Sequence, residues 1–372
     1  MRFTCEKSLL QSGVSITSRT VAVKSSIPSL EGILLEAGEQ LQLTGYNTKT
    51  GIRCMIGADV QEPGSIVLSS RLFGEIIRRL PDEAVSISVQ REVVTIRCGV
   101  SEFKIMGTDP EEYPALPSVE YQNTITMEQG ALMSMLNQTL FAVGHDESRA
   151  IQTGELFELD ESGVLTVVAV DGYRLALRRE KVQGGKPCSF VIPAASLIEV
   201  SKICSDSQES VEIVQGERHI MFKAGNVTLI SRRLEGNFLN YRNSIPAENP
   251  ISVTADRRQL ISAIDRCSLI ITEQQKSPLR CTFGQGLVKI KTSTPLGNAY
   301  DECPVAGDGK ELEIGFNNRY MLDALKAVPT PSITLSLNTA VSPCIITGAA
   351  EGDLPADAFT YMVLPVRLKA GV

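Results

Sequence analysis

The sequence predicts an α+β protein built from three tandem units, each with two helices packed on antiparallel sheets. One pattern of strand, amphipathic helix and helix stop occurs three times. It reads GSIVLSSRLFGEIIRRLP at 64–81, CSFVIPAASLIEVSKIC at 188–204 and LEIGFNNRYMLDALKAVP at 312–329. Corresponding residues such as Phe73, Leu197 and Met321 are 124 positions apart, so the 372-residue chain has room for three copies. A single hydrophobic core rarely serves a chain of this length.

Each of the three repeated helices is expected to have an apolar stripe and a charged face. Ile76, Val200 and Ala324 continue the apolar stripe at helical spacing. On the opposite face an acid precedes a base by three positions each time, in the pairs Glu75 and Arg78, Glu199 and Lys202, and Asp323 and Lys326. Because residues three apart lie on neighbouring turns, the sequence predicts an ion pair on each of these helices.

The other elements follow in the same order in each unit. A helix is expected to open each unit, at 6–20, 127–143 and 255–270, and a strand pair follows it at 31–54, 153–179 and 278–303. After the repeated helix a second strand pair is expected at 84–106, 211–233 and 332–349. The proline-marked segments DPEEYPALPSVEYQN and NSIPAENP interrupt these patterns and are interpreted as linkers. The predicted domains are therefore 1–121, 122–247 and 248–372.

The composition limits the classes of function that are compatible with the chain. Hydrophobic residues make up 43% and charged residues 21%, which is typical of a globular protein. Aromatic residues make up only 5% and Trp is absent, which argues against a base-stacking or sugar-stacking groove. The start MRFTCEKSLL is unlike a secretory signal and no run reaches membrane-spanning length, so we expect a cytoplasmic protein without a membrane partner. The nine cysteines contain no C-x-x-C pair, which favours reduced, mostly buried thiols.

The predicted helices differ in charge from the rest of the chain. They carry a small net positive charge, whereas the whole chain has a formal charge of −7. This asymmetry indicates that the helical layer faces something anionic. The alternative is that helices simply favour Arg and Lys.

No catalytic signature is present in the sequence. His145 and His219 are the only histidines, they lie in different units, and neither has metal-ligand spacing or a nucleophile partner. The phosphate-binding loop, the dinucleotide-binding G-x-G-x-x-G after a strand and the G-x-S-x-G elbow are all missing. We therefore expect no catalytic residue, no metal and no cofactor.

Several short segments of the sequence together are specific to one protein family. They are VDGYRLAL at 170–177, NYRNSIP at 240–246, LEIGFN at 312–317 and YMVLPVRL at 361–368, together with the opening MRFTCEKSLL. Through these segments the chain resembles, from end to end, the bacterial DNA sliding clamps, which are the beta subunits of DNA polymerase III.

The resemblance implies a head-to-tail homodimer that closes into a ring with its helices lining a central hole. Such a ring is a non-catalytic processivity factor that encircles duplex DNA without reading its sequence, which suits a weakly positive lining. The implied partners are double-stranded DNA, an ATP-driven clamp loader complex, the DNA polymerase III alpha subunit, and other polymerases and repair proteins that carry clamp-binding peptides.

The candidate DNA-facing residues are the cations of the helices and one loop lysine. The resemblance implies a loop contact at Lys24 and a second in the region of His145 and Asp146, although the latter residue is acidic. The full set is Lys24, Arg71, Arg78, Arg79, Lys202, Arg257, Arg258, Arg319 and Lys326.

The resemblance also implies a partner-peptide pocket between the second and third units, with an apolar rim suited to several related peptides. The matching residues are Val170, Tyr173, Arg174, Leu175, Leu239, Asn243, Ser244, Pro343, Met362, Leu364, Pro365 and Val366. Leu175, Leu364 and Val366 would be plain sheet core in the alternative interpretation. Gln152, where the family often has an aliphatic residue, and the polar Asn243 and Ser244 indicate a different peptide preference.

The dimer interface implied by the resemblance joins the first unit of one chain to the third unit of the other. Phe103 and Ile105 are expected to meet Leu269 and Ile270, while Arg97 and Lys104 face Asp301 and Glu302. Pairing this edge strand would also remove an aggregation hazard.

Two other functions remain open at this point. One is a three-repeat adaptor that binds peptides but does not encircle DNA. The other is an enzyme whose site forms between repeats, which would require titratable side chains close together.

Overall fold

The computed structural model describes residues 1–272, 274, 277–307, 310–348 and 358–368. The chain forms two compact units. Unit 1 comprises residues 1–133, 182–186 and 195–233, and unit 2 comprises residues 134–181, 187–194 and 234–372. The element order nevertheless repeats three times along the chain, as the sequence predicts.

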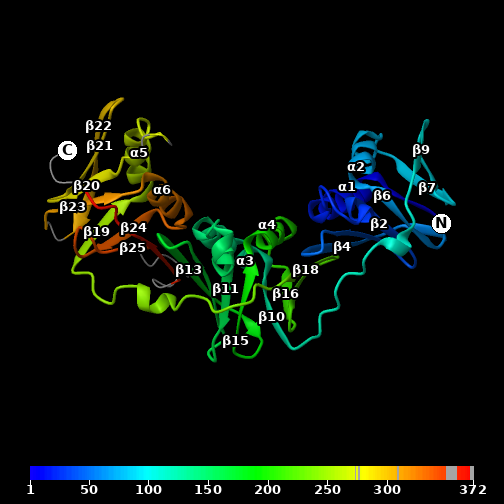
Figure 1. The fold of residues 1–372 in the computed structure, drawn as a ribbon, viewed down its shortest axis with the longest axis horizontal. Helices are drawn as coiled ribbons and strands as arrows, with labels where there is room; N and C mark the ends of the chain where they lie inside the picture. The colour runs from blue at the N-terminus through cyan, green and yellow to red at the C-terminus, as the bar shows by residue number, and fades with distance from the viewer. Residues whose placement is uncertain (273, 275–276, 308–309, 349–357, 369–372) are drawn as a thin grey trace. The chain divides into compact units, whose positions relative to one another are not determined.

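Each repeat contains a strand, a helix, a run of strands, a second helix and three further strands (Figure 1). The first repeat consists of β1 (Arg2–Glu6), α1 (Lys7–Thr17), β2 (Gly32–Ala37), β3 (Leu41–Tyr46), β4 (Thr50–Ile56), β5 (Asp59–Glu62), β6 (Gly64–Ser69), α2 (Ser70–Arg79), β7 (Ala84–Gln90), β8 (Val93–Cys98) and β9 (Ser101–Met106).

The second and third repeats follow the same order. The second consists of β10 (Asn123–Glu128), α3 (Gln129–Thr139), β11 (Gly154–Leu159), β12 (Val164–Val170), β13 (Arg174–Lys181), β14 (Gln183–Gly184), β15 (Cys188–Pro193), α4 (Ala194–Ile203), β16 (Ser210–Gln215), β17 (His219–Ala224) and β18 (Val227–Arg232). The third consists of β19 (Ile251–Asp256), α5 (Arg257–Ser268), β20 (Leu279–Phe283), β21 (Leu287–Thr294), β22 (Gly297–Gly307), β23 (Leu312–Phe316), α6 (Asn318–Ala327), β24 (Ser332–Leu337), β25 (Cys344–Gly348) and β26 (Phe359–Val363).

Two details of the sequence prediction are wrong. Each repeat opens with a strand, β1, β10 or β19, before its first helix, whereas a helix was expected there. Five of the six predicted strand pairs are also sets of three strands, because short turns such as the one at Gly99, where φ is +54°, divide what reads as one longer strand; the pair predicted at 332–349 is confirmed as β24 and β25. Each opening strand, such as β1 beside β7, extends the second sheet of its own repeat.

Unit 1 holds two antiparallel sheets. One has the order β5-β1-β7-β8-β9 and the other has the order β14-β10-β16-β17-β18-β4-β3-β2-β6. The second sheet crosses from one repeat to the next where β18 pairs with β4, with Ile230 opposite Gly51. Helices α1 and α2 pack beside each other and bury Leu10, Val14 and Phe73.

Unit 2 contains one extended antiparallel sheet in the order β15-β11-β12-β13-β26-β25-β24-β19-β22-β21-β20-β23. It also crosses between repeats, where β13 pairs with β26 and Leu175 lies opposite Met362. Helices α5 and α6 pack beside each other, and their apolar faces join a core that includes Leu260, Met321 and Phe359. In the part of the chain that the structure describes, no helix has the length and apolar character needed to cross a membrane.

Candidate functional site

The residues predicted for the peptide pocket all lie in unit 2, around the joint between β13 and β26. Val170, Leu175 and Met362 are buried in one apolar cluster, and Leu364 is half-buried against it. The backbone N–H of Leu364 donates to the carbonyl oxygen of Tyr173 at 2.9 Å, which continues the strand joint past the end of β26. The expected residues of the β12–β13 turn and of the chain after β26 are therefore brought together.

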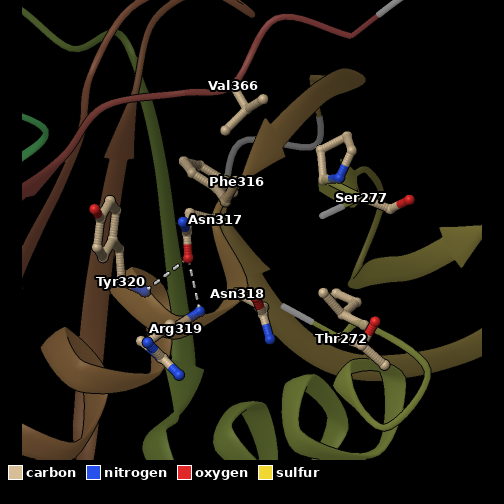
Figure 2. Close-up of a pocket in the computed structure, with 10 residues that line it drawn as sticks. Thr272, Ser277, Phe316, Asn317, Asn318, Arg319, Tyr320 and Val366 are labelled. Carbon is tan, nitrogen blue, oxygen red and sulfur yellow. Dashed lines mark hydrogen bonds between the residues drawn. The ribbon is translucent and has the colours of Figure 1, made fainter. Parts of the chain in front are cut away.

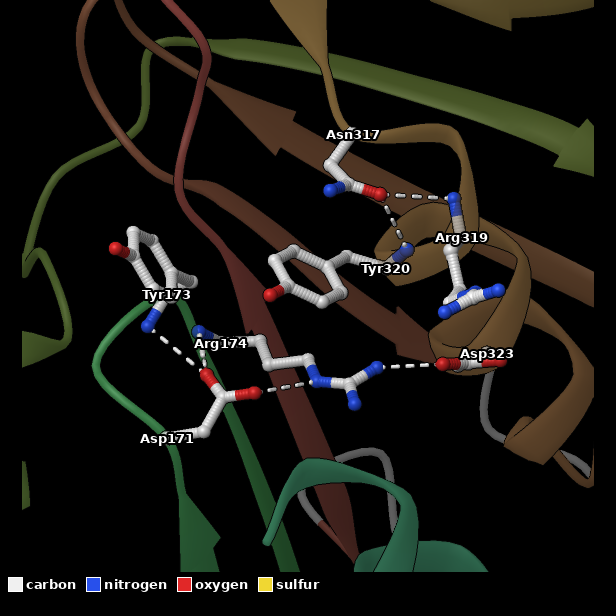
Figure 3. Close-up of polar contacts among 7 residues, drawn as sticks. All are labelled: Asp171, Tyr173, Arg174, Asn317, Arg319, Tyr320 and Asp323. Atoms are coloured by element: carbon white, nitrogen blue, oxygen red, sulfur yellow. Dashed lines mark hydrogen bonds and ion pairs between the residues drawn. The ribbon is translucent and has the colours of Figure 1, made fainter. Parts of the chain in front are cut away.

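The turn that precedes β13 is shaped by Asp171. Its Oδ1 accepts hydrogen bonds from the backbone N–H groups of Tyr173 at 2.9 Å and Arg174 at 3.1 Å (Figure 3). Gly172, between them, has φ +88°, a conformation in which a residue with a Cβ would be strained. The sequence DGYR thus has the aspartate and the glycine that this tight turn requires.

Arg174 is buried, and two nitrogens of its side chain donate to carboxylates within the chain. Nε donates to Oδ2 of Asp171 at 3.0 Å, and Nη1 donates to Oδ2 of Asp323 on α6 at 2.6 Å (Figure 3). The guanidinium carbon also lies 4.5 Å from the ring centroid of Tyr320 and 5.5 Å from that of Phe141. This arrangement ties the second repeat to the third and commits Nε and Nη1 to carboxylates of the chain, while a contact of Arg174 with a partner peptide stays a prediction.

Tyr173 and Tyr320 form an aromatic pair above this ion pair. Their rings are stacked with centroids 6.0 Å apart and an angle of 27° between the planes. Tyr173 is 61% exposed, so one face of the pair is open to solvent. Sequence reasoning identified Tyr173 but missed Tyr320, whose role becomes visible only when α6 is placed beside the turn.

A cavity of about 560 Å³ adjoins the aromatic pair (Figure 2). The start of α6 forms one wall, where Oδ1 of Asn317 accepts hydrogen bonds from the backbone N–H groups of Arg319 at 3.0 Å and Tyr320 at 3.3 Å. Val366 and Phe316 supply apolar surface, and the chain between α5 and β20 supplies Thr272 and Ser277. Arg319, which was predicted to face DNA, therefore lines a cavity that also includes Val366 of the predicted peptide pocket.

The segment that leads into the second linker is hydrogen-bonded to β11 next to this site. The Tyr241 hydroxyl donates to Oε2 of Glu158 at 2.7 Å, and Nη2 of Arg242 donates to the same oxygen at 2.8 Å. Burial and the bond to Glu158 together raise the pKa of Tyr241. Leu239 and Asn243 in this part of the chain are exposed, Ser244 is half-buried, and Pro343 is half-buried just before β25.

The charged faces of the helices agree with the sequence in two repeats and not in the third. Glu75 of α2 pairs with Arg78 at 2.6 Å and Arg79 at 2.9 Å. Glu199 of α4 pairs with Lys202 at 2.7 Å. The third predicted pair is wrong, because Asp323 bonds Arg174 and Lys326 instead lies 3.8 Å from Asp265 of α5.

The remaining candidate cations differ in the solvent exposure of their side chains. Lys24, Arg71 and Arg258 are exposed. Arg257 is half-buried and its Nη1 donates to the carbonyl oxygen of Val328 at 2.8 Å, so it connects the start of α5 to the end of α6. In the second loop region, Asp146 caps a short helix at Glu147–Thr153, and its bonds to Ser148 lower the pKa of its carboxyl group.

The chain is similar to known proteins along its whole length, in sequence and in structure. Three models of the DNA polymerase III beta subunit match this chain, the N-terminal domain at residues 1–117, the central domain at 126–240 and the C-terminal domain at 242–367. The beta sliding clamp of Bacillus subtilis (strain 168) is 34% identical over 382 residues and covers 99% of this chain and 100% of the relative. The beta sliding clamp of Staphylococcus aureus (strain Mu50) is 32% identical, with 99% of each chain covered.

Solved structures give the same result. The DNA polymerase sliding clamp from Bacillus subtilis has a TM-score of 0.94 and 33% identity, covering 99% of this chain and 100% of its own. A sliding clamp, DNA polymerase III subunit beta, from Pseudomonas aeruginosa bound to griselimycin has a TM-score of 0.94 and 28% identity at the same coverage.

Proposed function

The chain belongs to the DNA polymerase III beta subunit family and is a DNA sliding clamp, and on that basis we propose that two copies close into a ring that encircles duplex DNA and tethers the replicative polymerase to it. The protein is a processivity factor and is not itself catalytic. Its proposed partners are a clamp loader complex, the DNA polymerase III alpha subunit, and other polymerases and repair proteins that carry clamp-binding peptides.

The observation that carries the ring proposal is the pattern of strand edges. Successive repeats join through one strand of each. The third strand after the first helix of one repeat pairs with the last strand of the next repeat, as β4 does with β18 and β13 does with β26. Two equivalent strands remain. In the third repeat β22 corresponds to β4 and β13, and in the first repeat β9 corresponds to β18 and β26. Among the described residues, β9 pairs only with β8, and the first part of β22 pairs only with β21. A second copy of the chain can therefore complete the series in each direction.

The two observed joints also predict the register of the third. Gly51 lies opposite Ile230 in one joint and Leu175 opposite Met362 in the other. By equivalence, Asn298 of one copy lies opposite Lys104 of the second copy, and Ala299 lies opposite Phe103 of the second copy. Two symmetric joints of this kind close a dimer.

This register places the predicted interface residues on two faces of the joined sheet. Phe103 and Ile105 share the face of the buried residues Ile96 and Val94, which is the side of the helices, and Leu269 at the end of α5 is exposed to receive them. Asp301 is on that same side and bonds Nε of Arg266 at 2.5 Å.

The charged residues of the interface lie on the other face of the sheet. In one copy Arg97 and Lys104 both pair with Glu102, at 2.6 Å and 3.4 Å. In the proposed register Glu302 lies opposite Val100 and Lys104 lies opposite Asn298, so across the joint we propose that Glu302 faces Arg97, while Asp301 remains with its partner Arg266 on α5. The sequence prediction that both acids meet both bases is refined accordingly.

We propose that the helical cations contact the DNA phosphates without gripping them. The exposed Arg78, Arg79 and Lys202 each have an acid on the same helix, which reduces the net charge presented to DNA. A weakly positive surface of this kind favours sliding over tight binding, because affinity for duplex DNA increases steeply with the number of phosphates neutralised.

For the partner peptide we propose the apolar cluster at the β13–β26 joint together with the cavity beside α6. Val170, Leu175, Met362 and Leu364 would take apolar anchors, and Asn317 and the exposed Tyr173 would take polar ones. Arg174 acts as a positioning residue, because its two carboxylate partners hold the turn against α6.

The ring is tested by a crosslink in register. Phe103→Cys combined with Ala299→Cys, in a Cys188→Ser background, should give a covalent dimer under mild oxidation, since opposed strand residues meet the distance needed for a disulfide. Lys104→Cys with Ala299→Cys is one residue out of register and should not. A crosslink only in the second variant would contradict the proposed joint.

Encirclement is tested with the crosslinked ring and a nicked circular plasmid. The protein is loaded by a clamp loader and ATP before oxidation, and retention on the plasmid is measured by gel filtration at moderate salt. Release on linearising the plasmid is the expected result. Loss from circular and linear DNA alike, with the loader verified on another clamp, would favour the peptide-binding adaptor that does not encircle DNA.

A further inference from the structure

The joint between the first and second repeats has the same backbone arrangement as the joint that holds the peptide pocket. At the pocket, the N–H of Leu364 donates to the carbonyl oxygen of Tyr173 at 2.9 Å. In unit 1, the N–H of Arg232 donates to the carbonyl oxygen of Lys49 at 3.0 Å, just past the pairing of β18 with β4. Strands β4 and β18 lie side by side in Figure 1. At equivalent positions, cations in unit 1 thus replace apolar and aromatic residues.

Further basic residues surround this pair. His219 lies directly opposite Arg232 in the pairing of β17 with β18. The N–H of Arg233 donates to the carbonyl oxygen of Arg218 at 2.9 Å, and its Nη1 donates to the carbonyl oxygen of Glu217 at 3.0 Å. We define the cationic patch as the set Lys49, Arg218, His219, Arg232 and Arg233, all in unit 1.

The patch is open to solvent, and its members Lys49, His219 and Arg232 lie on the face of the sheet away from the helices of unit 1. Lys49, Arg218 and Arg232 are exposed, and the other two members are half-buried. The hydroxyl of Ser231 donates to Oγ of Ser196 on α4 at 2.8 Å, so Ser231 is on the helix side of β18. Arg232, the next residue on the strand, points to the opposite face. Lys49, His219 and Arg232 are therefore on the opposite face of the sheet from the helices proposed to contact DNA.

The local charge is positive although the whole chain has a formal charge of −7. The acids near the patch include Glu217 in the same turn, Glu235 three residues after Arg232, and Glu120 on the first linker, whose carbonyl oxygen lies close to Gly216; with His219 neutral, the patch carries four positive charges against these three negative ones. The pKa of His219 is lowered, first by partial burial and then by the charges of Arg232 and Arg218. The charges of Arg232 and Arg218 therefore act on the imidazole in addition to its partial burial.

We propose that the cationic patch is a second partner-docking surface, which binds an acidic segment of a protein partner, rich in Asp and Glu. Charge complementarity carries this assignment, since exposed guanidinium and ammonium groups pair with carboxylates and the patch lies outside the helical layer. Binding of this kind is weak at physiological salt and strengthens as ionic strength falls. The proposal is independent of whether the ring encircles DNA.

The test uses the full chain and a fluorescein-labelled 12-residue peptide of alternating Glu and Gly. Fluorescence anisotropy at low salt should show binding that weakens by about tenfold in the Lys49→Glu/Arg232→Glu variant, because two attractive pairs become repulsive. Lys223→Glu is the matched control, since Lys223 lies on the same strand as His219, beyond the patch, and pairs with Glu212 at 3.8 Å. Circular dichroism checks that each variant is folded.

NMR of the two imidazoles gives a second measurement in the unmodified protein. Because the chain has only two histidines, their signals are resolved without assignment of the whole spectrum. The peptide should raise the pKa of His219 and leave His145 unchanged. Equal affinity of the peptide for the double variant and the control, or an unchanged His219, would overturn the proposal. Tighter binding of a single-stranded oligonucleotide of equal charge at the same residues would also overturn it, in favour of nucleic acid.

Discussion

Glu155 makes the stability of the protein depend on pH in a way that a single substitution removes. Its side chain is fully buried on β11, and among the described residues neither carboxylate oxygen has a hydrogen-bond partner. Burial raises its pKa from 4.5 to about 8, and the nearby Thr139 hydroxyl, which itself donates to the carbonyl oxygen of Met135 at 2.9 Å, only partly opposes this rise. The folded chain therefore keeps a proton that the unfolded chain releases.

The sign and size of the effect follow from this difference. Because the folded pKa lies above the unfolded one, the stabilisation is complete below pH 4.5 and is lost as the pH rises towards 8. Between the two pKa values, each pH unit lowers the free energy of unfolding by slightly more than 1 kcal/mol. Ionisation of Glu155 should therefore lower the free energy of unfolding by about 4 kcal/mol from pH 5 to pH 8. Glu155→Gln stays neutral and should remove this slope, making the variant more stable than the parent at pH 8 but not at pH 5.

Urea unfolding followed by far-ultraviolet circular dichroism from pH 5 to pH 9 measures this difference, since the chain has no Trp for fluorescence. The protomer concentration is held constant because a dimer is less stable when diluted. Glu161→Gln, in the exposed turn after β11, is the control and should keep the parental slope. Parallel pH profiles for the parent and Glu155→Gln would refute the reasoning.

Three further predictions concern the pocket and the interface. Arg174→Met should lower the unfolding free energy by about 3 kcal/mol and weaken clamp-binding peptides in isothermal titration calorimetry, because two acids lose a buried partner; unchanged stability would contradict its positioning role. Phe103→Asp should shift the protein towards monomers in sedimentation velocity, whereas Val341→Asp, at another exposed apolar residue, should leave the dimer intact. Tyr241→Phe should cost about 1 kcal/mol in urea unfolding through the lost hydrogen bond to Glu158, and a change near zero would mean that the hydroxyl is equally well satisfied by water.

The repeat was visible in the sequence because it rests on local patterns. Phe73, Leu197 and Met321 all lie in buried helix faces, as their spacing predicts. The opening strands were missed because a segment such as RFTCE has only two apolar residues and runs directly into a helix with a stronger pattern. Local periodicity carries little information about a five-residue strand whose partners, such as β7, lie far along the chain.

The site was harder to predict from the sequence for the same physical reason. Asp323 reads as one half of a surface ion pair on α6, and nothing nearby in the sequence indicates that Arg174 binds it from 149 positions away. Glu155 reads as a solvent-facing residue of an alternating strand, yet its side chain is buried. Both exceptions involve charged groups under the helices, where the cost of burial depends on three-dimensional partners that no local pattern encodes.

A single backbone joint serves different purposes in the three positions of the repeat. At the β13–β26 joint, Leu175 and Met362 belong to the buried apolar cluster that is proposed to take a partner peptide, with Arg174 tying the joint to α6. At the β4–β18 joint, Leu116 of the first linker lies over Gly51, so the chain covers its own apolar surface there and presents Lys49 and Arg232 beside it. The third joint is the one proposed to form with a second copy of the chain. Because the side chains at these joints differ while the strand pairing is retained, binding specificity can change in one repeat without altering the pairing that the proposed ring requires.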